Sequence, residues 1–195
     1  LIENFKKLDH KKIKLIWSNL YDSYFQALNI SQIESQTRLL LNKEKGETIA
    51  KFIEDREEGL LNLLIYTSDR PNVFSSVVSV LDSENVNILD AKLFGTKDGF
   101  CIENITIADD SRENLLDETE KLREIEKKLK QILRIKDLKP SFVTKRLPIR
   151  LKSFSKKTTI EITQDDENGW TQLDIKTLDR PGLLASICKI FTENK

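Results

Sequence analysis

Residues 67–76 read Thr-Ser-Asp-Arg-Pro-Asn-Val-Phe-Ser-Ser, and residues 177–186 read Thr-Leu-Asp-Arg-Pro-Gly-Leu-Leu-Ala-Ser. Each stretch follows an apolar run typical of a strand, at 60–66 and 170–175, and each opens an apolar stretch typical of a helix. A repeat at this wide spacing predicts two copies of one supersecondary unit of domain size. The second copy stops one helix after it begins, so we expect the chain to be part of a longer protein.

The composition is that of a highly charged chain without net charge. Of 195 residues, 38% are hydrophobic and 33% are charged, and 32 basic residues balance 32 acidic ones. This balance provides no bulk field that would recruit nucleic acid or an anionic membrane. The sequence has no apolar run of about 18 residues and no signal-peptide pattern. The first residue is Leu and the chain contains no Met, which again favours a fragment.

The two cysteines, Cys101 and Cys188, lie in apolar contexts and form no CxxC motif. Free cysteine behaves as a small hydrophobic residue, so we predict two buried, reduced thiols. Such cysteine usage is typical of a cytoplasmic protein.

The N-terminal part of the chain, from residue 1 to about 54, is predicted to be helical. Residues 11–20 carry apolar side chains at helical spacing. Ser31 and Glu34 match a capping box, which predicts that another helix begins there. The domain boundary is predicted at the charged break formed by residues 55–59.

The central part is predicted to form strand, helix, hairpin and helix. Residues 60–66 are almost continuously apolar, as expected of a strand buried on both faces. Helical spacing follows Pro71 and ends near Asn85. Alternating apolar residues on both sides of a turn at 96–99 predict a β-hairpin. Residues 114–134 carry the strongest helical stripe, with acidic residues early and basic residues late, which suits the helix dipole.

The order of the predicted elements determines the fold class. A basic connector at 139–157 leads to an alternating strand at 158–163, and the second copy follows. The resulting order, β-α-β-β-α-β and then β-α, predicts an α+β chain with a ferredoxin-like unit. We expect a helical segment at residues 1–57, the βαββαβ domain at 58–165 and the start of a second such domain at 166–195.

The sequence offers little catalytic chemistry. Its only histidine, His10, lies in a charged stretch, so neither a zinc site nor a histidine-dependent catalytic triad can be assembled. Gly95 and Gly99 flank a turn between two strands and are not interpreted as a phosphate loop. The basic stretch at 145–152 lacks interleaved aromatic residues and is interpreted as a connector. We therefore predict no catalytic residue, no metal site and neither a nucleic-acid nor a membrane partner.

Two interpretations of the repeated Asp-Arg-Pro loops remain open. In the first, Asp69 and Asp179 cap the helices, and Pro71 and Pro181 preset φ in the first turn. In the second, the loops bind a ligand, because free N–H groups at a helix start attract carboxylates or phosphates. Glycine in the second loop would let a ligand approach the backbone closely.

A buried strand followed by Asp-Arg-Pro-Gly-Leu-Leu and a helix, in a β-α-β-β-α-β unit, resembles the ACT domain. The ACT domain is a small amino-acid-sensing module of bacterial metabolic enzymes. Two such units after a helical segment resemble the C-terminal part of a particular family, the bifunctional uridylyltransferase/uridylyl-removing enzymes that act on the PII signal protein. The matching stretches run over nearly the whole chain, at 16–25, 68–74, 88–94, 96–100 and 178–185.

This resemblance implies a regulatory function. In the family, one domain transfers UMP from UTP to a tyrosine of PII, a metal-dependent HD domain removes it, and the ACT pair senses glutamine. UTP and Mg²⁺ are thus implied for the parent enzyme, whereas this chain has neither catalytic motif and is expected to need no cofactor. Three alternatives remain: a tandem ACT module of another metabolic enzyme, a free-standing amino-acid-binding regulator, and ACT sheets that serve only in oligomerisation.

The predicted effector-binding residues lie in the two loops. They are Asp179, Arg180, Pro181, Gly182, Leu183 and Leu184 in the second loop and Asp69, Arg70, Pro71, Asn72 and Val73 in the first. An amino acid offers a carboxylate to the N–H groups at a helix start and an ammonium to an aspartate. Asn72 replaces the glycine of the motif, and its side chain is expected to occupy part of the pocket. We therefore expect the second loop to be the better glutamine contact.

Overall fold

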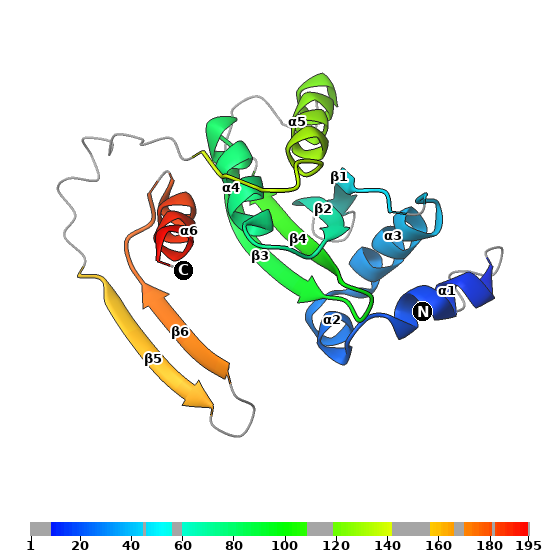
Figure 1. The fold of residues 1–195 in the computed structure, drawn as a ribbon, viewed down its shortest axis with the longest axis horizontal. Coiled ribbons are helices and arrows are strands. Elements are labelled where there is room, and N and C mark those ends of the chain that lie inside the picture. The colour runs from blue at the N-terminus through cyan, green and yellow to red at the C-terminus, as the bar shows by residue number, and fades with distance from the viewer. Residues whose placement is uncertain are drawn as a thin grey trace.

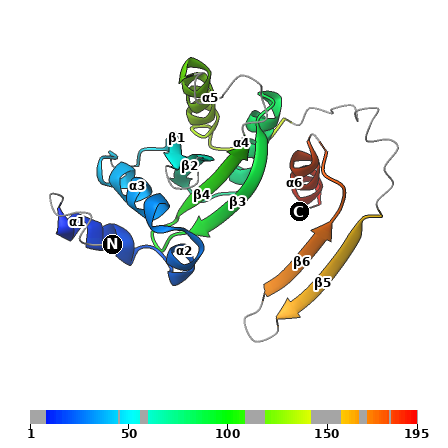
Figure 2. The same ribbon diagram turned by 180° about the vertical axis from the view of Figure 1, so that it is seen from behind.

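The computed structural model describes residues 9–44, 46–55, 60–108, 119–141, 157–165, 170–180 and 182–194. It combines helices with antiparallel strands, which confirms the predicted α+β class and the helical N-terminal segment (Figure 1, Figure 2). In chain order the elements are α1 (His10–Ser18), α2 (Asp22–Ala27), α3 (Ile30–Leu41), β1 (Ile49–Asp55), β2 (Leu60–Ser68), α4 (Val73–Ser83), β3 (Asn87–Gly95), β4 (Phe100–Ala108), α5 (Thr119–Ile132), β5 (Thr159–Asp165), β6 (Trp170–Lys176) and α6 (Leu183–Glu193).

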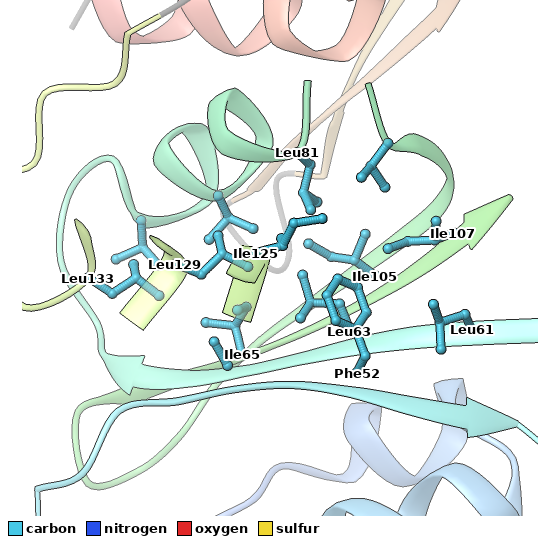
Figure 3. Close-up of a cluster of buried hydrophobic side chains, with 14 of the residues drawn as sticks. Phe52, Leu61, Leu63, Ile65, Leu81, Ile105, Ile107, Ile125, Leu129 and Leu133 are labelled. Carbon is cyan, nitrogen blue, oxygen red and sulfur yellow. The ribbon is translucent and has the colours of Figure 1, made fainter. Parts of the chain in front are cut away.

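The main sheet has the strand order β1-β2-β4-β3, with every neighbouring pair antiparallel. Its central strand β2 is buried at every position from Leu61 to Thr67, as the continuous apolar run predicts. Leu63 and Ile65 belong to the core beneath α4 and α5, which Figure 3 shows in close-up. Leu64 and Tyr66 point the other way and pack against the N-terminal helices. The sheet is therefore the middle layer of three.

The helix α5 closes the first core as the predicted stripe requires. Ile125, Leu129 and Leu133 are buried against the sheet. Glu126 fastens the helix to β1, because its carboxylate accepts hydrogen bonds from the backbone N–H of Phe52 (2.9 Å) and from Lys51 Nζ (3.1 Å). The part of the predicted helix before Thr119 lies outside the described residues.

The N-terminal helices are held to the sheet by apolar and polar contacts. Tyr24 donates a hydrogen bond to Gln36 (2.9 Å), and Gln36 donates one to Asn104 of β4 (2.9 Å). The capping box predicted at Ser31 and Glu34 is wrong. Asn29 caps α3 instead, since its side chain accepts from the N–H of Gln32 while Gln32 accepts from the N–H of Asn29.

Residues 49–55, expected to be helical, form the strand β1. Their side chains alternate between the two layers: Ala50 and Phe52 face the α4–α5 core, and Ile49 faces the N-terminal helices. β1 occupies the edge of β2 that the strand at 158–163 was expected to fill, and that strand (β5) pairs with β6. The prediction that it completes the first sheet is therefore wrong, because backbone pairing on that side of β2 is already satisfied.

The structural repeat begins one strand earlier than the sequence motif. β1 and β5, β2 and β6, and α4 and α6 each start 110 residues apart. At the end of each hairpin away from its turn, two threonine hydroxyl groups are hydrogen-bonded. Their oxygen atoms are 3.1 Å apart in Thr48 and Thr67 and 2.8 Å apart in Thr158 and Thr177. The domain boundaries at 57/58 and 165/166 stay predictions, and both fall between paired strands.

The second copy of the repeat contacts the first through its helix. α6 packs beside α4 (Figure 1), with Ala185 and Cys188 buried against Val78. The β5–β6 sheet has no such cover among the described residues: Ile162 is 70% exposed, whereas its counterpart Phe52 is 8% exposed. Contact with α4 therefore accounts for the burial of the second copy seen here.

Replacing Leu129 with alanine tests the core beneath α5. Leu129 is fully buried, so Leu129→Ala should lower the free energy of unfolding by about 2–5 kcal/mol, measured by urea denaturation. The exposed Lys127→Ala on the same helix is the matched control and should change it by about 0.5 kcal/mol or less. Similar effects of the two substitutions would contradict the packing of α5 on the sheet.

Candidate functional site

The two Asp-Arg-Pro loops have the same backbone geometry. Asn72 (φ 69°) and Gly182 (φ 74°) adopt the left-handed conformation immediately before α4 and α6. Neither helix has a hydrogen bond from an N-cap side chain. The capping interpretation of the aspartates is therefore wrong, since the left-handed residue takes the cap position and Asp69 lies three residues before it. The positive φ explains why asparagine or glycine stands there.

The side chains of the first loop secure the end of α5. Arg70 donates hydrogen bonds to the carbonyl oxygens of Leu133 and Ile135, and Asn72 Nδ2 donates to that of Leu138 (3.0 Å). A cation at the C-terminal end of a helix also suits the helix dipole. Sequence reasoning missed this role, because the acceptors are backbone atoms more than 60 residues away.

The second loop opens onto a groove of about 870 Å³ between α6, α4 and β3. Of the predicted site residues, Asp179, Arg180, Gly182, Leu183 and Leu184 line this groove together, and Pro181 lies outside the described residues. The opposite wall includes Val78 and Asp82 of α4 and Ile88 and Ala91 of β3.

Gly182 lies close to the opposite wall of this groove. A Cβ atom at this position would stand 3.5 Å from Oδ1 of Asp82. A longer side chain would therefore enter the space between α6 and α4. The apolar face of α6 predicts that this segment packs on the first unit or on a neighbouring chain, or else frays; the structure shows that its partner is α4.

A smaller cavity of about 260 Å³, here called the first-loop cavity, lies beside the first loop. Asp69, Arg70, Asn72 and Val73 line it as predicted, whereas Pro71 is exposed and does not. Sequence reasoning missed the other lining residues, which are Phe74, Ser75, Leu93, Phe94, Gly95, Cys101 and Glu103. A charged residue among the alternating apolar positions of β4 was the available signal for Glu103.

Glu103 is the most perturbed carboxyl group of the site. It is 2% exposed, and its Oε2 has no hydrogen-bond partner among the described residues. Burial, together with the nearby charge of Asp69, raises the pKa of Glu103 to about 8. Burial also raises the pKa values of the free thiols of Cys101, to about 12, and Cys188, to about 11, which disfavours reactive thiolates.

Metal and membrane features are not seen in the described part of the chain. Within the described ranges, no three His, Cys, Asp or Glu side chains are grouped so that they could hold a metal ion. Among the described helices, none combines the length and apolar character needed to span a bilayer.

The pH dependence of the free energy of unfolding tests whether Glu103 is protonated in the folded chain. Because its pKa is raised from 4.5 to about 8, the folded chain holds a proton that the unfolded chain has lost. The free energy of unfolding should therefore fall as the pH rises through this range, by up to about 1.4 kcal/mol per pH unit. Glu103→Gln should remove this fall in urea denaturation series, whereas Glu161→Gln on the exposed face of β5 should keep it. Identical pH profiles for all three proteins would contradict a protonated Glu103.

Comparison with known proteins finds relatives that share one name. A bifunctional uridylyltransferase/uridylyl-removing enzyme of Pseudomonas fluorescens is 30% identical over 95% of this chain, and one of Acinetobacter baumannii is 28% identical over 98%. Another from Pseudomonas savastanoi is 30% identical over 95%. The chain spans 21% of the length of each of these relatives. No family profile and no solved structure matches it. The resemblance seen in the sequence is thus confirmed: nearly the whole chain is similar to a segment of the bifunctional uridylyltransferase/uridylyl-removing enzyme.

Proposed function

We propose that this chain is the regulatory, glutamine-sensing segment of an enzyme similar to the bifunctional uridylyltransferase/uridylyl-removing enzyme. The parent enzyme would transfer UMP from UTP to a tyrosine of the PII signal protein with the help of Mg²⁺, and would remove it by hydrolysis in the cytoplasm. The similarity over 95–98% of the chain to enzymes of that name supports this assignment. The chain itself would supply binding rather than chemistry, since its only histidine is the exposed His10.

The groove at the second loop is the observation that carries the proposal. A free amino acid needs donors for its carboxylate and an acceptor for its ammonium. The start of α6 lacks an N-cap side-chain bond. The N–H of Leu183 is bonded to the carbonyl oxygen of Arg180 (3.1 Å), so the next N–H groups of the helix would receive the carboxylate, and Asp179 and Asp82 would supply acceptors. The apolar wall formed by Leu183 and Val78 would cover the methylene groups of a glutamine side chain.

Hydrogen bonds within the first unit connect the first loop to the N-terminal helices through the β3–β4 turn. The backbone N–H of Asp69 donates to the carbonyl oxygen of Gly99 (3.0 Å) in the β3–β4 turn. In the same turn, the backbone N–H of Lys97 donates to the carbonyl oxygen of Asn19 (2.8 Å). The side-chain ammonium of Lys97 donates to the carbonyl oxygen of Ser18 (2.8 Å). A displacement of the first loop would therefore act on the junction of α1 and α2.

Narrowing the groove at Gly182 tests the effector site. Gly182→Asn keeps a residue that tolerates positive φ but adds a side chain next to Asp82. We expect it to raise the dissociation constant for glutamine by about tenfold or more, because the loss of one charge-assisted contact is worth about 1.5–3 kcal/mol. The measurement is NMR titration of the chain with glutamine, read from the backbone amides of Leu183 to Ile187.

Gly46→Asn is the matched control for this substitution. Gly46 also has positive φ (75°), and a Cβ there would meet nothing within 4 Å. This variant should bind glutamine as the unchanged chain does. If Gly182→Asn binds equally well, or if the amides of the groove do not respond to glutamine at all, the second loop is not the effector site.

The isolated chain should be catalytically inactive. We expect neither transfer of UMP to PII from UTP and Mg²⁺ nor release of UMP from modified PII, because the sequence contains neither catalytic motif. Radiolabelled UMP on PII, followed over time against a control without the chain, measures both reactions. Turnover that follows the chain through a second purification would overturn the regulatory assignment.

A further inference from the structure

The charges of this neutral chain are unevenly distributed along its sequence. Residues 121–157 contain 14 Lys or Arg residues but only three Asp or Glu residues, although the whole chain contains 32 of each kind. The structure describes residues 119–141 of this region, which contain the helix α5 and the turn after it. Such a concentration of one charge within a neutral chain favours a local electrostatic contact over a bulk field.

Four of these basic residues follow one another along α5 and the turn that closes it. Arg123, Lys127 and Lys130 are spaced by four and three residues, so they share one face of the helix over about 10 Å. Arg134 comes four residues later, in the turn, where its backbone N–H donates to the carbonyl oxygen of Gln131 (3.3 Å). Lys130 is half-buried and the other three are exposed. These four residues are called the basic stripe below.

The basic stripe is turned away from the core. α5 lies on the outside of the first unit (Figure 1, Figure 2), and its buried side carries Ile125, Leu129 and Leu133. Glu126, which precedes Lys127, is directed to β1 and binds Lys51 there (3.1 Å). Among the residues that the structure describes, none of the four side chains of the stripe forms an ion pair or a hydrogen bond. Its positive charge is therefore open to a partner.

The two exposed edges of α5 differ in how their charges are paired. In the basic stripe, Arg123 has Lys127 as its neighbour on the helix, and like charges at this spacing weaken a helix. On the other edge, Lys128 lies four residues after Glu124, which is a favourable order, and binds Glu84 of α4 (2.7 Å). A row of unpaired like charges beside a paired edge is expected where a partner supplies the opposite charge.

We propose that the basic stripe is a docking surface for an acidic segment of a partner protein, whose carboxylates pair with its four cations. Carboxylates three or four residues apart on a helix have the same spacing as the stripe, so two adjacent helices would match charge for charge. The two arginines can each hold a carboxylate through two parallel N–H donors, which adds direction to the contact. No residue of the stripe lines the groove at the second loop, so this surface is separate from the proposed effector site.

Other anionic partners suit this surface less well. Residues 119–141 contain no aromatic residue on which a nucleic-acid base could stack. Glu120, Glu124 and Asp137 are exposed and would repel the phosphates of a nucleic acid laid over the segment. A membrane surface also takes up apolar side chains, and within residues 119–141 Ile135 is the one large apolar residue that is exposed. An acidic protein segment can place its carboxylates on the stripe alone.

Fluorescence anisotropy of a synthetic acidic peptide with the full chain tests this proposal. The probe is a labelled alanine-rich peptide with glutamates spaced by four, three and four residues, and a second peptide has glutamines in their place. We expect the glutamate peptide alone to bind. Its dissociation constant should rise about threefold or more between about 50 and 300 mM NaCl, because salt screens exposed charges. No binding of the glutamate peptide at the lower salt concentration would overturn the proposal.

Charge-removing variants place the binding on the stripe. The double substitution Lys127→Gln and Lys130→Gln should raise the dissociation constant of the glutamate peptide about fivefold or more. The matched control, Lys11→Gln with Lys14→Gln, removes two exposed charges from α1 and should change it less than about twofold. Both variants should keep the urea midpoint of the unchanged chain, which excludes loss of folding. Equal weakening by the two variants would mean general attraction and would overturn the proposal.

Competition separates an acidic protein partner from a nucleic acid. Unlabelled glutamate peptide should displace the labelled probe, and a short DNA duplex at the same concentration of negative charge should displace it less. In NMR titrations, the peptide should shift the backbone amides of residues 123–134. Displacement by the duplex at lower charge concentration than by the peptide, or amide shifts confined to other segments, would overturn the assignment of the stripe to an acidic protein segment.

Discussion

The strand β2 has neighbours on both faces and at both edges, and the rest of the structure is arranged around this burial. Its backbone needs hydrogen bonds from two strands, which β1 and β4 provide. Its apolar side chains need cover on two sides: Leu63 and Ile65 receive it from α4 and α5, and Leu64 and Tyr66 from the N-terminal helices. The helical segment is therefore an integral layer of the first unit, although it precedes the strands in sequence.

The same burial fixes the place of the first loop, which leaves the end of β2. The backbone of Asp69 is bonded to Gly99, while the side chains of Arg70 and Asn72 bind carbonyl groups after α5. The second loop has the same backbone but no such ties among the described residues, and its Arg180 is exposed. The two loops thus share one backbone conformation but differ in their contacts. The first loop anchors neighbouring segments, and the second borders an open groove.

The surroundings of the two loops differ in their electrostatics. The groove at the second loop is wide, and the exposed Asp179 keeps its contact with water. Beside the first loop, Glu103 is cut off from solvent, and this burial together with the charge of Asp69 raises its pKa to about 8. Because α6 packs on α4, which starts at the first-loop cavity and contributes to the groove wall, both places share one structural element. The proposed effector in the groove would therefore act on α4.

The sequence by itself determined the elements whose signals are local. The unbroken apolar run predicted β2, helical spacing predicted α4 and α5, and Asn72 and Gly182 were compatible with the left-handed turn before each helix. Tertiary structure decided the partners: β1 became a strand because β2 had an open edge, and Arg70 bonded to carbonyl groups more than 60 residues away. It also decided the environment of Glu103, whose burial raises its pKa. Such contacts join segments distant in sequence, and no local periodicity encodes which segments will meet.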